Sequence, residues 1–201
     1  MKAKAPCRAQ SAHASSALMR GYFGIGVEGI SKPMNLGSLM RTAHAFGASF
    51  CFAIGAVFDT REARLADTSD AMQSLPFHDY PDLEAFQLPK GCQLVGLEFI
   101  EDAVELPSFR HPMRAAYVMG AERDDLSPAL LARCDHVVKI PTRFCVNVAL
   151  AGALVMYDRM ISLGRFAERP VRAGGPKEPQ SPHRHGEPIW KRKQRTRLLK
   201  P

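Results

Sequence analysis

Short apolar runs separated by segments of helical periodicity dominate the middle of this chain. Runs with the length and composition of β-strands occupy residues 22–27, 50–57, 93–99, 115–120 and 136–141, with a shorter candidate at 75–80. Helical patterns lie between or after them, at residues 36–47, about 61–72, 81–87, 127–133 and 147–163. Several runs are apolar at consecutive positions, which is typical of strands covered on both faces. This alternation predicts an α/β fold with a mostly parallel sheet flanked by helices.

The excess positive charge of the chain is confined to its C-terminal end. Residues 1–169 carry 18 Lys/Arg and 18 Asp/Glu, whereas residues 170–201 carry nine basic and two acidic side chains, which accounts for the formal net charge of +7. A basic, proline-rich segment cannot bury a core, so it is either a solvated tail or a contact for a phosphate backbone. We therefore expect an N-terminal arm (1–19), one α/β domain (20–166) and a basic tail (167–201).

Several classes of protein are disfavoured by composition. No run reaches the ~18 uninterrupted apolar residues that a membrane span needs. The five cysteines form no CxxC pair, so neither a disulfide framework nor a metal site is indicated, and a reducing cytoplasmic setting is expected. Residues 1–20 lack the apolar stretch of a secretion signal. They are basic and free of acidic residues, which fits a disordered arm and also an organelle transit peptide.

The segment GIGVEG, residues 24–29, matches the GxGxxG pattern of dinucleotide-binding proteins. That motif requires a helix to open within it, and no helical pattern begins there. We therefore expect these glycines to mark a strand and its exit turn.

Three segments follow predicted strands, and ligands bind at the carboxyl ends of strands in open α/β sheets. They read NLGSLMRTAHAFGA (35–48), YVMGAERDDLSPALL (117–131) and VVKIPTRFCVNVALAGALVMYD (137–158). In the first, Asn35 stands where an N-cap is expected. Arg41 lies about 160° from the middle of the apolar arc, so it is either solvated or faces a partner or an anionic substrate. The helix alone leaves both possibilities open.

The other two segments carry similar signals. Glu122 follows a buried strand directly, which favours a site role over loop decoration. Ser127 and Pro128 have the residue types expected at the N-cap and first position of a helix. Asn147 has the same capping signal before a helix that is apolar nearly all round over 148–157, so this helix should pack on several sides, in part against a second subunit.

Together the three segments resemble the three ordered motifs of the SpoU (TrmH) family of RNA methyltransferases in the SPOUT superfamily, over residues 22–164. The resemblance implies an α/β fold whose C-terminal part is tied in a trefoil knot, an exception to the usual absence of knots. It further implies S-adenosylmethionine as cofactor, a homodimer, no metal, and methylation of a ribose 2′-hydroxyl of tRNA or rRNA.

The resemblance also implies roles for individual residues. Arg41 matches the catalytic arginine and Asn35 the asparagine beside it, while Glu122 and Asn147 match the glutamate of the second motif and the asparagine of the third. The residues implied to bind the cofactor are Leu97, Gly120, Ile140, Cys145 and Val146.

The sequence departs from the family pattern at two places. Cys145-Val146-Asn147 stands where the family commonly reads Ser-Leu-Asn, and Asp125 replaces a glycine. Backbone contacts survive such changes, but a thiol is a weaker hydrogen-bond donor than a hydroxyl. Two alternatives stay open: a catalytically inactive RNA-binding protein of the same fold, which the Cys145-Val146 departure supports, and a methyltransferase that modifies a base, against which the Asn35/Arg41 pair argues.

Overall fold

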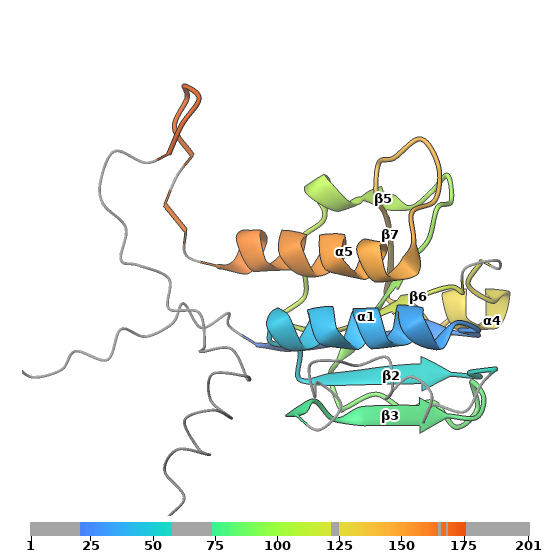
Figure 1. Ribbon diagram of the computed structural model, residues 1–201. Coiled ribbons are helices and arrows are strands. Elements are labelled where there is room, and N and C mark those ends of the chain that lie inside the picture. The colour runs from blue at the N-terminus through green and yellow to red at the C-terminus, as the bar shows by residue number, and fades with distance from the viewer. Residues whose placement is uncertain (1–20, 58–73, 122–124, 165, 168, 176–201) are drawn as a thin grey trace, which may run out of the picture.

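The computed structural model describes residues 21–57, 74–121, 125–164, 166–167 and 169–175. Within these residues, seven strands form one sheet in the order β3-β2-β1-β6-β4-β7-β5, and every pairing is parallel (Figure 1). The strands are β1 (Tyr22–Glu28), β2 (Phe50–Ile54), β3 (Phe77–Tyr80), β4 (Gln93–Leu97), β5 (Val104–Glu105), β6 (Arg114–Met119) and β7 (His136–Lys139). The expected parallel α/β sheet is confirmed, and the candidate strand at 75–80 is β3.

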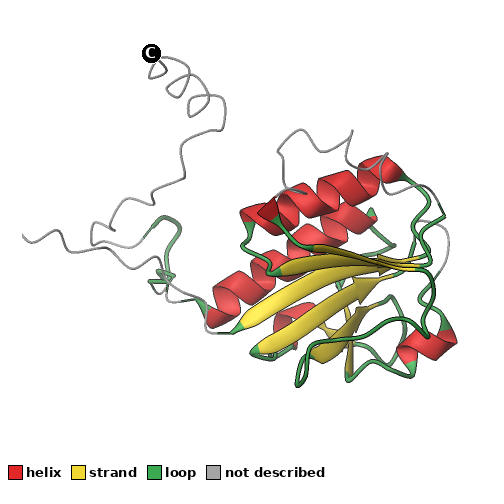
Figure 2. Ribbon diagram, turned by 90° about the horizontal axis from the view of Figure 1, so that it is seen from below, coloured by secondary structure: helices red, strands yellow, loops and turns green. Residues whose placement is uncertain are grey.

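Two long helices cover one face of the sheet. Helices α1 (Pro33–Ala45) and α5 (Val148–Leu163) lie side by side and pack against each other (Figure 1). The short helix α4 (Pro128–Leu131) and the segment 81–92 cover the other face, and a 3-10 turn, η1 (Leu106–Ser108), follows β5. Figure 2 shows the long helices stacked on the strands. Of the described helices, none is both long and apolar enough to cross a membrane.

Both faces of the sheet are buried, which explains why the strands are apolar at consecutive positions. Under α1 and α5 the core contains Phe23, Ile25, Val27, Tyr117 and Met119 of the strands, together with residues of both helices. On the opposite face the core contains Phe52, Phe86, Leu94, Val118 and Leu130. At roughly 1.5–3 kcal/mol for each fully buried large apolar side chain, these two layers supply the main favourable term in folding.

The glycines of the GxGxxG segment are explained by packing within the sheet. Gly24 and Gly26 lie inside β1, and a Cβ atom on either would overlap the ring of Phe50 or Phe52 in the neighbouring strand. Gly29 follows the strand with φ +64°, a conformation that glycine adopts without strain. The prediction of a strand and its exit turn is confirmed.

Helix α1 begins three residues earlier than predicted, so the assignment of Asn35 as its N-cap is wrong. Pro33 is the first helical residue, and Lys32 is the N-cap without a side-chain capping bond. Proline suits this position because its ring presets a helical φ and no amide hydrogen is needed there. The other two capping predictions are confirmed: Asn147 accepts from the amide of Ala149 (2.9 Å), and Ser127 accepts from that of Leu130 (3.2 Å).

The helix predicted at 81–87 is also wrong, because turns occupy this segment. The guanidinium of Arg133 donates to the carbonyl oxygens of Leu83 (2.6 Å) and Phe86 (2.8 Å). These two backbone acceptors therefore bond to a side chain from outside the segment. Asp82 caps the single turn by accepting from the amide of Ala85 (2.8 Å). The helix predicted at about 61–72 lies outside the described residues.

A buried polar cluster anchors α5 to the amino ends of the central strands. The side chain of Arg159 is fully buried, and its guanidinium donates to the carbonyl oxygens of Pro112 (2.6 Å) and Met113 (2.9 Å) and to Tyr117 Oη (3.1 Å). It also lies 5.3 Å from the centroid of the Phe23 ring, a cation–π distance. The apolar helix predicted at 147–163 therefore contains a buried charge, whose terminal guanidinium nitrogens donate to backbone oxygens while its Nε is buried without a hydrogen-bond partner.

His111 completes this cluster. Its Nδ1 lies 2.6 Å from Tyr117 Oη and its Nε2 lies 2.9 Å from Asp158 Oδ2. Burial disfavours the imidazolium and lowers the pKa of His111, while Asp158 opposes the shift. Burial raises the pKa of Tyr117 to about 12, so its hydroxyl stays protonated at neutral pH.

Candidate active site

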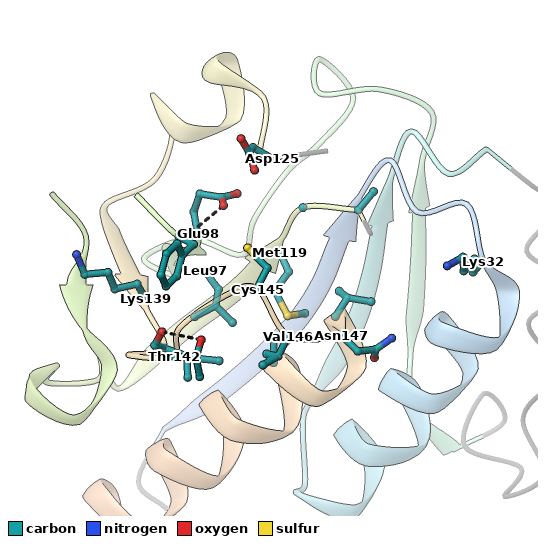
Figure 3. Close-up of a pocket in the computed structure, with 16 residues that line it drawn as sticks. Lys32, Leu97, Glu98, Met119, Asp125, Lys139, Thr142, Cys145, Val146 and Asn147 are labelled. Carbon is teal, nitrogen blue, oxygen red and sulfur yellow. Dashed lines mark hydrogen bonds between the residues drawn. The ribbon is translucent and has the colours of Figure 1, made fainter. Parts of the chain in front are cut away.

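A pocket of about 470 Å³ opens at the carboxyl ends of the central strands (Figure 3). Its walls come from the segments that follow β4, β6 and β7 and from the first turns of α5. These three strands are neighbours in the sheet, so the segments that leave them converge although they are far apart in sequence. The pocket lies where the sequence predicted a ligand site.

All of the residues implied to bind a cofactor line this pocket. Leu97 is the last residue of β4, and Gly120 and Ile140 directly follow β6 and β7. Cys145 and Val146 lie just before α5, where the side chain of Cys145 is exposed. The structure brings the five residues together, and their role in binding stays a prediction.

The two asparagines singled out by the sequence meet at the edge of the pocket. Asn147 Nδ2 donates to Asn35 Oδ1 across 3.3 Å, which joins the first turns of α1 and α5. Asn147 lines the pocket, and its own Oδ1 at the same time caps α5. Lys32, the N-cap residue of α1, lines the pocket as well.

Arg41 lies on α1 with an exposed side chain, as predicted from its position away from the apolar arc. The buried residues of the helix are Leu36, Gly37, Leu39, Met40 and Ala43. Arg41 is six residues beyond Asn35, or about 9 Å along the helix axis, and it is not among the described residues that line the pocket. Glu122 lies outside the described residues.

Two carboxylates that the sequence analysis missed hold the segment after β6. Glu98 Oε2 accepts from the amide of Leu126 (2.7 Å), and Glu28 accepts from both the amide (2.7 Å) and the hydroxyl (2.6 Å) of Ser127. Each glutamate stands at the end of an apolar strand, the same signal that singled out Glu122. A search for carboxylates at the ends of predicted strands would therefore have found both glutamates.

Further contacts brace the other walls. Lys139 Nζ donates to the carbonyl oxygens of Ile100 (3.2 Å) and Glu101 (2.7 Å), and Thr142 Oγ1 donates to that of Phe144 (2.9 Å). Both Lys139 and Thr142 line the pocket; they lie within the third motif segment, but the sequence analysis assigned no role to either of them.

The lining combines apolar walls with balanced charge. Leu97, Met119 and Val146 supply apolar surface, whereas Lys32, Lys139, Glu98 and Asp125 supply two positive and two negative groups. Such a site suits a small molecule with an apolar body and charged ends. Among the described residues, no group of three or more His, Cys, Asp or Glu is arranged to hold a metal ion.

Comparison with known proteins identifies the family. The model of the SpoU rRNA Methylase family matches residues 23–157. This chain belongs to that family. The resemblance drawn from the three motif segments is thus confirmed, and the match includes the strands and helices that build the pocket.

The relatives of this SpoU family member are distant in sequence. The tRNA (guanosine(18)-2′-O)-methyltransferase of Escherichia coli (strain K12) is 26% identical over 137 residues, which cover 66% of this chain and 60% of the relative. A mouse protein with the same activity in its name is 27% identical over 138 residues, which cover 64% of this chain and 9% of that protein. The chain therefore spans less than two thirds of the length of either relative.

Solved structures share its fold. An rRNA methyltransferase from Sinorhizobium meliloti superimposes with a TM-score of 0.65 at 22% identity, covering 74% of this chain and 59% of that one. The SpoU methyltransferase AviRb from Streptomyces viridochromogenes, in complex with the cofactor AdoMet, superimposes with a TM-score of 0.60 at 25% identity, covering 71% and 60%.

Proposed function

We propose that this chain is an S-adenosylmethionine-dependent methyltransferase that acts on a ribose 2′-hydroxyl of tRNA or rRNA. The observation that carries the proposal is the convergence of the second and third motif segments on one pocket, with the first joined to it through the Asn35–Asn147 bond. The family match and the names of the relatives, which include tRNA 2′-O-methyltransferases, support the reaction.

The pocket fits the proposed methyl donor. Its volume of about 470 Å³ is within the range of small-molecule sites. Its apolar wall suits an adenine ring, and backbone groups at Gly120 and Ile140 suit the hydrogen-bonding atoms of that ring. When bound, the donor supplies an electrophilic methyl group on a positively charged sulfur.

Arg41, in this proposal, supports the attack of the ribose oxygen. A ribose hydroxyl is a poor nucleophile at neutral pH, so stabilising the developing negative charge on its oxygen is the main demand. A guanidinium supplies a fixed positive charge and a planar set of donors that also suits a phosphate. It does not act as a general base because it stays protonated. Asn35 and Asn147 would orient the first turns of α1 and α5 around the reacting groups.

A homodimer belongs to the proposal because Arg41 does not line the pocket of its own chain. A second copy would then present Arg41 to the pocket of its partner. Large apolar side chains exposed on and just before α5 support such an interface: Phe144 is 74% exposed, Leu150 52% and Tyr157 46%. Covering them in a dimer would remove apolar surface from water.

The trefoil knot and the setting of the protein are also part of the proposal. Strand β4 lies between β6 and β7 in the sheet although it precedes both in the chain, so the connections there are not those of a simple sequential sheet. Four free cysteines among the described residues support a reducing cytoplasmic setting. We keep the division into an arm (1–19), a methyltransferase domain (20–166) and a tail (167–201).

Incubation with S-adenosylmethionine carrying a labelled methyl group and with total RNA tests the function. We expect label in one RNA species, at a nucleoside identified by mass spectrometry as 2′-O-methylated. Label on a base would establish the base-directed alternative. If calorimetry finds no binding at millimolar donor, the inactive RNA-binding alternative replaces the proposal.

Deletion of residues 170–201 should weaken RNA binding and make its salt dependence shallower. This segment carries nine basic and two acidic side chains, and each phosphate contact that is lost lowers the salt slope by about 0.7–0.9. Binding titrations over a range of salt concentrations measure the slope, and donor binding by calorimetry, which should not change, serves as the control. An unaltered slope would show that the tail does not contact RNA.

A further inference from the structure

Two glutamates from different strands hold consecutive backbone amides beside the pocket. Glu98, directly after β4, accepts from the amide of Leu126 at 2.7 Å, and Glu28, at the end of β1, accepts from the amide of Ser127 at 2.7 Å. Glu28 also accepts from the hydroxyl of Ser127 at 2.6 Å. All three bonds are charge-assisted and short, so they are stronger than neutral ones.

These bonds hold the two residues that directly follow Asp125, and Asp125 is the residue of this segment that contributes to the pocket wall. Asp125, which immediately precedes Leu126, lines the pocket, as does Glu98 itself. Glu98 is 9% exposed and Leu126 is 2% exposed, so their hydrogen bond is shielded from water. Shielding strengthens the bond and makes the loss of either partner costly.

We propose that Glu98 and Glu28 are positioning residues: by holding the amides of Leu126 and Ser127, they fix the pocket wall at Asp125 in the shape required by the methyl donor. This inference rests on the proposed function. Both carboxylates act through the backbone at 126 and 127, and neither is a catalytic residue.

Both carboxylate oxygens of Glu98 accept hydrogen bonds from backbone amides. Its Oε1 accepts from the amide of Phe99 at 2.8 Å, while its Oε2 accepts from that of Leu126. Each oxygen is therefore engaged by a backbone donor. A carboxylate held at both oxygens is fixed in its orientation, as the positioning role requires.

Amide hydrogen exchange in the donor-free protein tests the bracing itself. In Glu98→Gln, one oxygen is replaced by a donor group and the charge is lost, so we expect the amide of Leu126 to exchange at least about tenfold faster. The matched control is Glu101→Gln, which removes an exposed carboxylate three residues further along the chain. In this variant the amide of Leu126 should exchange at the same rate as in the unsubstituted protein. Equal exchange in Glu98→Gln and Glu101→Gln would overturn the bracing.

Calorimetry with S-adenosylmethionine tests whether the bracing serves the donor. We expect the Kd of Glu98→Gln to rise at least about fivefold, with kcat at saturating donor within about threefold of normal, because the wall is disturbed and the reacting groups are not. Glu98→Asp retains the charge but shortens the reach, so it should show the same defect. A normal Kd in Glu98→Asp would assign the effect to charge and overturn the geometric role.

The remaining outcomes are also decisive. Faster exchange with an unchanged Kd would overturn the positioning role. If Glu98→Gln does not fold, Glu28→Gln examines the same wall through Ser127 and should give the same pattern. If the unsubstituted protein binds no S-adenosylmethionine, the proposed function and the donor-positioning role fail together, while the exchange rates still decide whether the glutamates brace the wall.

Discussion

Replacing Arg41 by alanine should lower kcat for RNA methylation at least about 100-fold, the cost of removing one transition-state donor, and leave the Kd for S-adenosylmethionine within about threefold. The separation is expected because Arg41 lies on α1 with an exposed side chain, whereas the described residues that line the pocket do not include it. Single-turnover kinetics with labelled donor measure the first quantity, and calorimetry measures the second.

A matched control for this experiment is Arg110→Ala, since Arg110 is exposed and lies before β6 at the other end of the sheet. It should methylate RNA at the normal rate. Arg41→Lys retains the charge without the planar set of donors and should recover only part of the activity. Normal turnover in Arg41→Ala would remove Arg41 from the mechanism.

The second large effect concerns stability. Replacing Arg159 by methionine should lower the free energy of unfolding by about 3–5 kcal/mol, because a buried charge network loses its central member. The carbonyl oxygen of Pro112 would then lose its guanidinium donor inside the protein. The carbonyl of Met113 would keep only the amide of Tyr22, and the hydroxyl of Tyr117 would keep only His111. Urea unfolding followed by circular dichroism measures the loss, and the melting temperature should fall by roughly 10 °C.

Arg169→Met is the matched control for that substitution, because Arg169 is exposed beyond the end of α5. It should change stability by less than about 0.5 kcal/mol, as is usual for surface positions. If Arg159→Met costs no more than this control, the cluster at the amino ends of the strands does not anchor α5.

The strands were predictable because consecutive residues are apolar in the strands of a parallel sheet that is buried on both faces. The apolar run at 50–57 shows that this pattern does not fix where a strand ends, since β2 ends at Ile54. Gly55 follows with φ +59° and donates its amide hydrogen to Tyr80, so the chain turns although the residues after it stay apolar. The two-residue strand β5 was not predicted, because so short a segment carries no periodicity.

Strand order was not predictable from the same pattern. Periodicity shows that residues form a strand but not which strand pairs with it, and the insertion of β4 between β6 and β7 depends on pairings across the whole domain. The helix start at Pro33 was missed for a different reason. Asparagine is a common N-cap residue, which favours Asn35 as the cap, although Pro33 stands two positions earlier. The structure shows that the proline marks the start of the helix.

The site was predictable where motifs stand at strand ends, as at Gly120 and Ile140. That Arg41 lies away from the pocket could not be predicted, because its position depends on how α1 packs on the sheet. The buried bonds of Glu28 and Glu98 were missed since their partners lie 99 and 28 residues away in the chain.

The central place of β1 in the sheet has a consequence for biosynthesis. Its partner on one side, β6, pairs residues 22–27 with residues 114–119, so that edge of β1 stays open until most of the domain has left the ribosome. Pairing over such a separation is slow, and an unpaired apolar strand invites aggregation. Nascent chains that stop before residue 119 should therefore depend on chaperones to stay soluble.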